Sequence, residues 1–238
     1  MPVTSASSTG LLARLGQAGP AVWVLDLTDP GWDLAAAAGC LTAPELAHAA
    51  SAVPAVRRRR LLLRAGLRAV VGGILGVPPE AAPIRTDAGR PHVLTGTDRS
   101  LGISCSASDG VGLIAAAADL RIGVDVQRHR DDEARQAWDE GWLAAAEQRA
   151  LARLPVADRL PAVTRSWTQK EAVLKGRGVG LHVAPDTVVV PGTPTGRSGA
   201  WWLAPVPVPA GYAATLAVES ATPLTDLPVL QLTPGGSR

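Results

Sequence analysis

Apolar and polar residues follow two periods along the chain, one typical of strands and one typical of helices. Short apolar runs bounded by turn residues predict strands at residues 21–27, 101–106, 111–118, 121–126, 187–190, 201–206 and 213–219, and those at 101–106 and 111–118 are expected to be buried. Apolar positions three or four residues apart predict helices in residues 44–76, 131–154 and 162–174, which end at Gly76, at Pro155 and at the glycine series from Gly176. Each half of the chain therefore places a basic-edged helix before strands. This order is compatible with a duplication, although no sequence repeat marks one.

The composition is that of a folded protein. The 238 residues are 47% hydrophobic and 18% charged, which suits one large domain or two small ones. No apolar run reaches the roughly 18 residues of a membrane-spanning helix, and the polar start lacks the layout of a signal peptide. We therefore expect a soluble, cytoplasmic protein without a membrane partner. Cys40 and Cys105 are expected to be reduced thiols, because two cysteines form no disulfide framework.

The charge pattern leaves local phosphate binding open. A net charge of +2 excludes a surface that coats polyanions generally. Residues 57–60 are all arginine, and Arg64 and Arg68 continue the basic side of that helix. Such a run is usually a solvated face or a nucleic-acid patch. With one Tyr and no Phe, stacking platforms for single strands are poorly supplied, so we expect no nucleic-acid partner.

Two short segments concentrate side chains suited to chemistry. In residues 166–181, SWTQKEAVLKGRGVGL, helical spacing puts Glu171 and Lys175 on one face. An isolated pair of this kind is usually a surface ion pair, but here alternate glycines follow that allow close backbone approach to a ligand. In residues 122–127, IGVDVQ, strand alternation puts Asp125 and Gln127 on one face. An acid between valines is either exposed on an edge strand or, if buried, paired or bound to a metal.

These segments, in this order, resemble the signature motifs of the 4'-phosphopantetheinyl transferases of the longer, Sfp-like type. The motifs are commonly G-[IV]-D-[IV]-E and W-[ST]-x-K-E-[AS]-x-x-K-x-x-G-x-G-L. DAGRP at residues 87–91 is similar to the family's G-K-P turn, and LGISCSA at 101–107 to its F-N-x-S-H-S-G strand. WLAAAEQRAL at 142–151 and PAGYAATLAV at 209–218 extend the match, so that the resemblance covers roughly residues 23–219.

The resemblance implies an α+β fold: a monomer of two similar α/β halves that form a pseudo-dimer. Each half is expected to pack a small, mainly antiparallel sheet on a long helix, with coenzyme A and Mg²⁺ in the cleft between the halves. We expect residues 21–118 to bind the nucleotide end and residues 119–232 to carry the metal and catalytic motifs. Residues 1–20 and 233–238 are expected to be flexible ends.

The family transfers the 4'-phosphopantetheine arm of coenzyme A to a serine of an acyl or peptidyl carrier protein and releases adenosine 3',5'-bisphosphate. Carried over, Asp125 and Glu171 hold Mg²⁺, with Gln127 at a further ligand position, and Glu171 has a part in deprotonating the serine. Lys175 neutralises phosphate charge, with Lys170 nearby. The contacts expected for the nucleotide end are Arg57, Arg59, Arg64, Arg90, Ser104 and Cys105. The alignment of the three helix arginines leaves a shift of one residue open, and polyketide carriers are further expected partners.

Departures from the family pattern leave a second function open. Gln127 stands where the family often has an acidic metal ligand, and a neutral amide oxygen coordinates Mg²⁺ more weakly. Cys105 replaces a histidine that contacts a coenzyme A phosphate, and a thiol is neither cationic nor a strong donor. The alternative to an active transferase is therefore a weakened homologue that binds coenzyme A or a carrier protein without turnover. A nucleic-acid-binding module is a third alternative, which rests only on the arginine run.

Overall fold

The chain divides into two α+β units. The structure is a computed structural model that describes residues 19–87, 90–93, 100–130, 137, 139–179, 183–224 and 226–237. Unit 1 comprises Met1–Asp119 and Asp226–Arg238, and unit 2 comprises Leu120–Thr225. Each unit has one main, largely antiparallel sheet and one helix of 22 residues, which confirms the predicted fold class. The pseudo-dimer itself stays a prediction.

Unit 1 is built on a five-stranded sheet. Its strands are β1 (Ala21–Asp26), β4 (Leu101–Ser108), β5 (Val111–Ala118), β10 (Val229–Thr233) and β11 (Gly236–Ser237), in the order β11-β10-β1-β5-β4. Neighbours are antiparallel except β1 and β10, which are parallel. A separate hairpin pairs β2 (Ile84–Asp87) with β3 (Arg90–Val93), after the 3-10 turn η1 (Pro79–Ala81). Thus β10, which is close to the C-terminus, belongs to the same sheet as β1.

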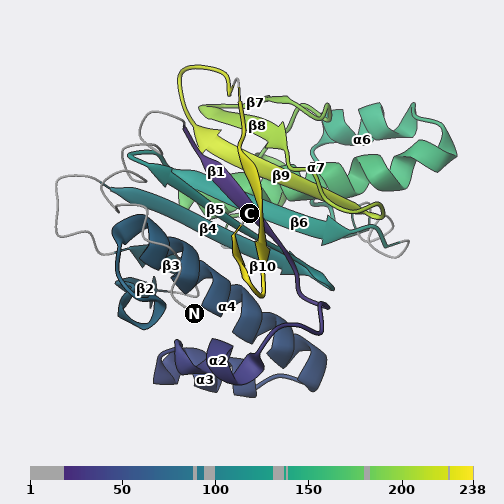
Figure 1. The fold of residues 1–238 in the computed structure, drawn as a ribbon. Coiled ribbons are helices and arrows are strands. Elements are labelled where there is room, and N and C mark those ends of the chain that lie inside the picture. The colour runs from purple at the N-terminus through teal and green to yellow at the C-terminus, as the bar shows by residue number, and fades with distance from the viewer. Residues whose placement is uncertain are drawn as a thin grey trace. The chain divides into compact units, whose positions relative to one another are not determined.

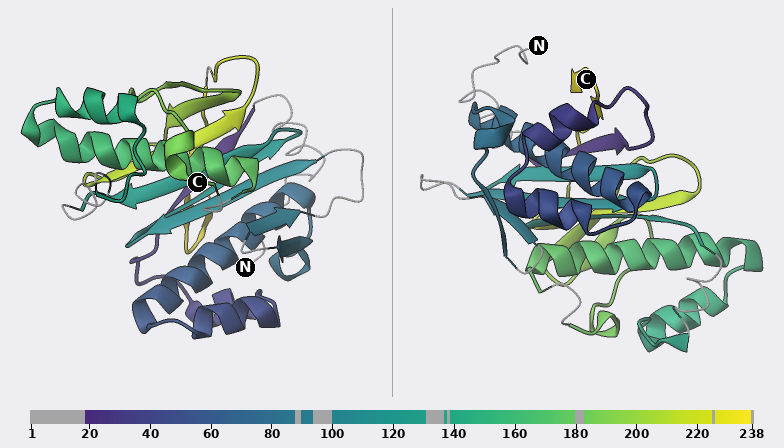
Figure 2. Two further views of the ribbon diagram at one scale, coloured as in Figure 1. Left: turned by 180° about the vertical axis from the view of Figure 1, so that it is seen from behind. Right: turned by 90° about the horizontal axis from the view of Figure 1, so that it is seen from below.

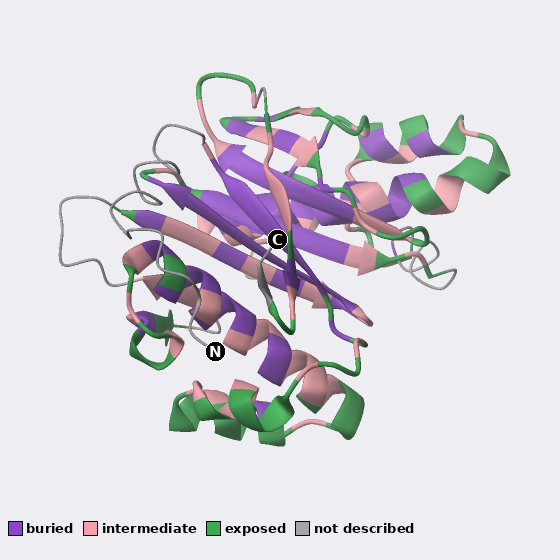
Figure 3. Cartoon of the chain, viewed as in Figure 1, coloured by how far each residue is buried: buried purple, intermediate pink, exposed green. Residues whose placement is uncertain are grey.

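Helix α4 (Pro54–Leu75) organises the unit 1 core. Its apolar stripe, including Leu67 and Ile74, is fully buried against the sheet. Proline at the first turn favours its start, and Gly76 ends it in the left-handed conformation at φ 69°. Two shorter helices, α2 (Leu34–Gly39) and α3 (Ala43–Ala50), pack against α4 (Figure 1). Figure 3 shows that they are mostly exposed, so α4 carries the core contacts while α3 offers side chains at the surface.

Unit 2 packs one long helix on a four-stranded antiparallel sheet. The strands are β6 (Ile122–Arg128), β7 (Gly196–Ser198), β8 (Trp201–Pro205) and β9 (Tyr212–Glu219), in the order β6-β9-β8-β7. Helix α7 (Val156–Arg177) lies along β6 and β9, with α6 (Ala145–Ala152) beside its first half (Figure 2). Gly123 permits this close approach, since a Cβ there would collide with the carbonyl oxygen of Ala172. The end of α7 is therefore held directly over β6.

Three predicted elements differ from the structure. The predicted strand at residues 187–190 is wrong: η3 (Pro185–Thr187) leads into irregular chain, in which Val188 O and Val190 N bond to buried side chains. Helix α7 begins six residues before the predicted start and continues through Pro161, near its exposed first turns. In the predicted helix at 131–154, the segment 131–136 and Trp138 lie outside the described residues, and a turn at Gly141 precedes α6.

The chain ends also differ from expectation where they are described. Thr233 pairs with Gly236 between β10 and β11, so the expected flexible tail takes part in a hairpin. Because β10 pairs with β1, residues from Asp226 onward belong to unit 1 and not to the expected second half. Residues 1–18, most of the expected flexible start, lie outside the described part. Within the described part, no helix combines the length and the apolar character needed to cross a membrane.

Candidate active site

Strand β6 and helix α7 bring a lysine and an aspartate into direct contact. Lys175 Nζ donates to Asp125 Oδ1 at 2.6 Å, and it lies 3.3 Å from Val124 O. The Asp125 side chain is 7% exposed and that of Lys175 28% exposed. Gly123, two residues before Asp125, lets the last turns of α7 approach β6. The strand and the helix motifs therefore meet at one place in unit 2.

Glu171, one turn before Lys175, adds a second carboxylate. Its Oε1 is buried, and among the described residues nothing forms a hydrogen bond with it. Burial raises the pKa of Glu171, the charge of Asp125 raises it further, and Lys175 opposes both. Two carboxyl groups and one ammonium group thus lie together, with Asp125 buried and Glu171 and Lys175 partly buried. Such a site is suited to a hard cation with oxygen ligands.

Two buried threonines join helix α7 to strand β9 near these carboxylates. Thr168, one turn before Glu171, and Thr215, the β9 partner of Asp125, are both buried. Their hydroxyl oxygens lie 2.9 Å apart. This hydrogen bond ties α7 to β9 beside the candidate site. Sequence reasoning missed both residues, although Thr168 stands inside the second signature segment and the helical period places it on the face of Glu171.

Lys170, which was expected near the phosphates beside Lys175, lies in the protein interior and pairs with Glu147. Its side chain is 0% exposed, and its ammonium group lies 2.7 Å from Glu147 Oε2 and donates to Val188 O at 2.6 Å and Pro185 O at 3.0 Å. Burial lowers the pKa of Lys170, and the hydrogen bond and charge of Glu147 oppose this shift. Glu147 also accepts from Val190 N and Ala144 N. The geometry therefore supports a structural role, joining α6, α7 and the chain after η3.

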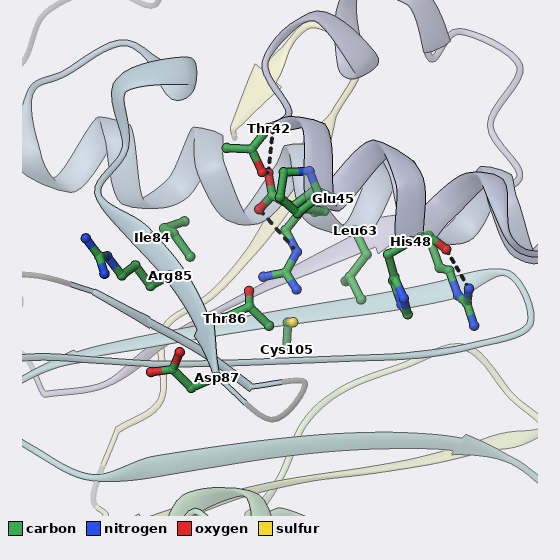
Figure 4. A pocket seen from close by; sticks show the side chains of 12 residues that line it. Thr42, Glu45, His48, Leu63, Ile84, Arg85, Thr86, Asp87 and Cys105 are labelled. Carbon is green, nitrogen blue, oxygen red and sulfur yellow. Dashed lines mark hydrogen bonds and ion pairs between the residues drawn. The ribbon is translucent and has the colours of Figure 1, made fainter.

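Unit 1 contains a basic pocket of about 800 Å³. It is lined from α3, α4, β2 and β4, and Figure 4 shows Thr86 and Cys105 facing Glu45 and Leu63 across it. Arg60 and Arg64, one helical turn apart on α4, supply cationic groups. Arg64 Nη1 is buried, and no described group forms a hydrogen bond with it. These side chains are suited to hold an anion.

Glu45 does not cancel the positive charge of this pocket. Arg68 Nε donates to Glu45 Oε2 at 2.8 Å, while Arg64 Nε lies 3.6 Å from Oε1. Thr42 N also donates to the carboxylate, which closes a capping box at the start of α3. Burial by itself raises the pKa of Glu45, but the bonds from Arg68 and Thr42 outweigh it, and the net pKa is lowered. The buried Arg68 is thus the nearer partner of Glu45, and Arg64 contacts the carboxylate at the longer distance. Arg60 is held at the pocket by hydrogen bonds from its Nη1 to His48 O at 2.7 Å and Ser51 Oγ at 3.3 Å.

Comparison with known proteins finds similarity to one family. A family model described as the 4'-phosphopantetheinyl transferase superfamily matches residues 121–209, which include the β6 and α7 motifs. The chain is also 29% identical over 163 residues to the 4'-phosphopantetheinyl transferase HetI from Nostoc sp. (strain PCC 7120 / SAG 25.82 / UTEX 2576), covering 67% of this chain and 69% of that protein. The chain is therefore similar to the 4'-phosphopantetheinyl transferase superfamily in the part that carries both motifs. Both matches support a phosphopantetheinyl transferase enzyme, with phosphopantetheine transfer as its general chemistry.

In this transferase the predicted metal and catalytic residues lie together. Asp125, Glu171 and Lys175 form one cluster, and strand alternation puts Gln127 on the same face of β6 as Asp125. Within the described residues, no three His, Cys, Asp or Glu side chains are grouped so as to hold a metal ion. The cluster therefore offers two carboxylates, with an amide where the family often has a third.

The predicted nucleotide contacts of the transferase are only partly brought together. Arg64 and Cys105 line the unit 1 pocket. Arg57 and Arg59 are not among its lining residues, and Ser104 is buried on the face of β4 opposite Cys105. The side chain of Arg90 lies outside the described part. The roles of these residues stay predictions.

Three further residues of this pocket were not among the predicted nucleotide contacts. His48, Arg60 and Arg85 also line it. Arg60 precedes Arg64 by one helical turn, which is the signal that could have found it. His48 and Arg85 come from other elements, so only the packing of α3 and β2 beside α4 reveals them.

Proposed function

We propose that this phosphopantetheinyl transferase transfers the 4'-phosphopantetheine arm of coenzyme A to a serine hydroxyl of an acyl, polyketide or peptidyl carrier protein. Adenosine 3',5'-bisphosphate is the other product. The observation that carries the proposal is the cluster of Asp125, Glu171 and Lys175 inside the region that matches the family. Phosphoryl transfer depends mainly on positioning and on neutralisation of charge, and this cluster offers anionic and cationic groups side by side.

We propose Mg²⁺ as the metal of this cluster. Asp125 and Glu171 would hold it, with the amide oxygen of Gln127 as a weaker donor. The fit rests on the buried Glu171 Oε1, which has no hydrogen-bond partner among the described residues, and on the preference of Mg²⁺ for carboxylate oxygen. When bound, Mg²⁺ supplies charge neutralisation at the pyrophosphate of coenzyme A.

The remaining steps belong to the side chains of the cluster. Lys175 donates hydrogen bonds to phosphate oxygens and thereby offsets the charge that develops during transfer. Glu171 accepts the proton of the acceptor serine, directly or through one water. Thr168 and Thr215 hold the strand and the helix in place, so that these groups keep their mutual positions. Lys170, which is buried, contributes to the site by fixing the fold around it.

The unit 1 pocket is proposed to receive the nucleotide end of coenzyme A. Arg60 and Arg64 would bind its phosphate groups, since guanidinium groups match phosphate oxygens in pairs. The buried Arg64 Nη1, to which no described residue offers an acceptor, supports this, because an unsatisfied buried donor is unfavourable until a ligand satisfies it. Cys105 lines this pocket with a small, polarisable side chain at the position where the family commonly has histidine.

Mass spectrometry of a carrier protein tests the proposal. An apo carrier incubated with coenzyme A, Mg²⁺ and the enzyme should gain the mass of one phosphopantetheine group. The Glu171→Gln variant should lose this activity while keeping its fold, and Asp158→Asn, at the exposed start of the same helix, should retain it. A panel of fatty-acid, polyketide and peptide carriers identifies the partner, and size-exclusion chromatography with light scattering tests the proposed monomer.

The same panel decides between turnover and binding alone. Measurable binding of coenzyme A without transfer to any carrier would contradict the proposal. That result would favour the weakened homologue suggested by Gln127 and Cys105. Near-normal transfer by Glu171→Gln would instead contradict the role given to Glu171.

A further inference from the structure

Lysine is rare in this chain, and its two positions have opposite environments. Lys170 and Lys175 are its only lysines. The ammonium group of Lys170 is fully buried by Glu147 and two backbone carbonyls. Lys175 is 28% exposed and is bound to Asp125 Oδ1 at 2.6 Å. A reagent that modifies accessible lysine amines should therefore react with Lys175 and not with Lys170.

The contact between Lys175 and Asp125 involves the carboxylate that is proposed to hold the metal. Asp125 Oδ1 accepts a short hydrogen bond from the Lys175 ammonium group, and the Asp125 side chain is only 7% exposed. A divalent cation at Asp125 and Glu171 would place a second positive charge beside the Lys175 ammonium. Like charges this close repel strongly where little water screens them. The metal and Lys175 therefore compete for Asp125.

We propose that Lys175 is an exchangeable counter-ion. Without metal it neutralises Asp125, and metal binding displaces its ammonium group, which then becomes available to phosphate oxygens. This inference rests on the proposed function, because it takes Asp125 as a metal ligand. It goes further by coupling two binding events: the metal releases the lysine, and a phosphate group that holds the lysine strengthens metal binding by the same factor.

Acetylation of Lys175 measures this exchange without measuring transfer. The full-length protein, free of coenzyme A, is treated briefly with an amine-acetylating reagent, with and without saturating Mg²⁺, and the peptides are quantified by mass spectrometry. We expect Lys175 to be acetylated several times faster with Mg²⁺, while Lys170 remains unmodified in both samples. In Asp125→Asn, acetylation of Lys175 should already be fast and should not respond to Mg²⁺.

Metal affinity provides the second measurement. Calorimetric titration with Mn²⁺ as a surrogate for Mg²⁺, again without coenzyme A, compares Lys175→Gln with the wild type. We expect about tenfold tighter binding in Lys175→Gln, the scale of one charged hydrogen bond. Lys175→Arg, which keeps the charge, should not show this gain. Arg177→Gln removes the same charge two residues further along α7 and is the matched control.

The outcomes separate the inference from the proposed function. Equal tightening in Lys175→Gln and Arg177→Gln would mean that general charge, and not the ion pair, opposes the metal, and the inference would be wrong. Metal binding that leaves acetylation of Lys175 unchanged would also overturn it, although the proposed transfer and its metal would stand. If neither Mg²⁺ nor Mn²⁺ binds, the metal assignment fails and the inference fails with it. Loss of carrier modification is tested separately by the transfer assay.

Discussion

The buried pair of Lys170 and Glu147 allows a quantitative test of what Lys170 does. Replacing Lys170 with Met keeps the side-chain volume similar but leaves the carboxylate of Glu147, only 5% exposed, without its counter-ion. It also leaves Val188 O and Pro185 O without their donor. Breaking a buried ion pair by removing one partner costs about 3–5 kcal/mol. For a chain of this length, each kcal/mol lowers Tm by roughly 2–4 °C, so we expect a drop of roughly 6–20 °C.

Thermal and urea unfolding followed by circular dichroism measure this loss. The double variant Lys170→Met/Glu147→Gln should recover part of it, because no charge then remains buried alone and the glutamine oxygen can still accept from the backbone. Glu219→Gln, which removes the charge of an exposed pair with Arg121 and leaves the other contacts of the arginine in place, is the control and should cost at most about 1 kcal/mol.

Two results would refute the reasoning. One is a Lys170→Met protein with unfolding free energy within about 1 kcal/mol of the wild type, well below the cost of an orphaned buried charge. The other is a stably folded Lys170→Met protein that binds coenzyme A much more weakly than the wild type. The second result would return Lys170 to the ligand-binding role that its place in the signature motif predicted.

Three further predictions concern packing, pH and the nucleotide pocket. Gly123→Ala should destabilise the protein by about 1–3 kcal/mol or more in urea unfolding, since its Cβ would collide with Ala172 O on α7; an unchanged transition midpoint would contradict the close approach. Because the pKa of Glu45 is lowered in the folded state, its contribution to stability is full above the ordinary glutamate value of about 4.3 and is lost as pH falls through the lower, folded value. The unfolding free energy of Glu45→Gln should therefore fall less steeply with acid than that of the wild type, and equal slopes would exclude this role. Arg64→Gln should weaken coenzyme A binding in calorimetry by about tenfold, the scale of one charged hydrogen bond, while Arg153→Gln, at an exposed position in unit 2, should not; equal effects would argue against the pocket.

The motif residues were predictable because local periodicity decides which of them share a face. Strand alternation puts Asp125 and Gln127 on one side of β6, and the helical period puts Glu171 and Lys175 on one side of α7. The same periods located the strands at residues 101–106 and 111–118 within two residues of β4 and β5. The run at residues 187–190 shows the limit of such reasoning. Its valines are apolar and partly buried as in a strand, but its backbone groups bond to Lys170 and Glu147.

The sequence by itself determined the two signature segments and their residue types, because these depend on spacing within one strand or one helix. Only the tertiary structure decided what the two lysines contact. Five residues along a helix turn by about 140°, so Lys170 and Lys175 point in different directions, and the sheet and α6 determine which side is buried. Lys170 therefore meets Glu147 in the interior, whereas Lys175 meets Asp125 at the candidate active site. Contacts between segments far apart in the chain depend on how elements pack, and that information is not contained in any local pattern.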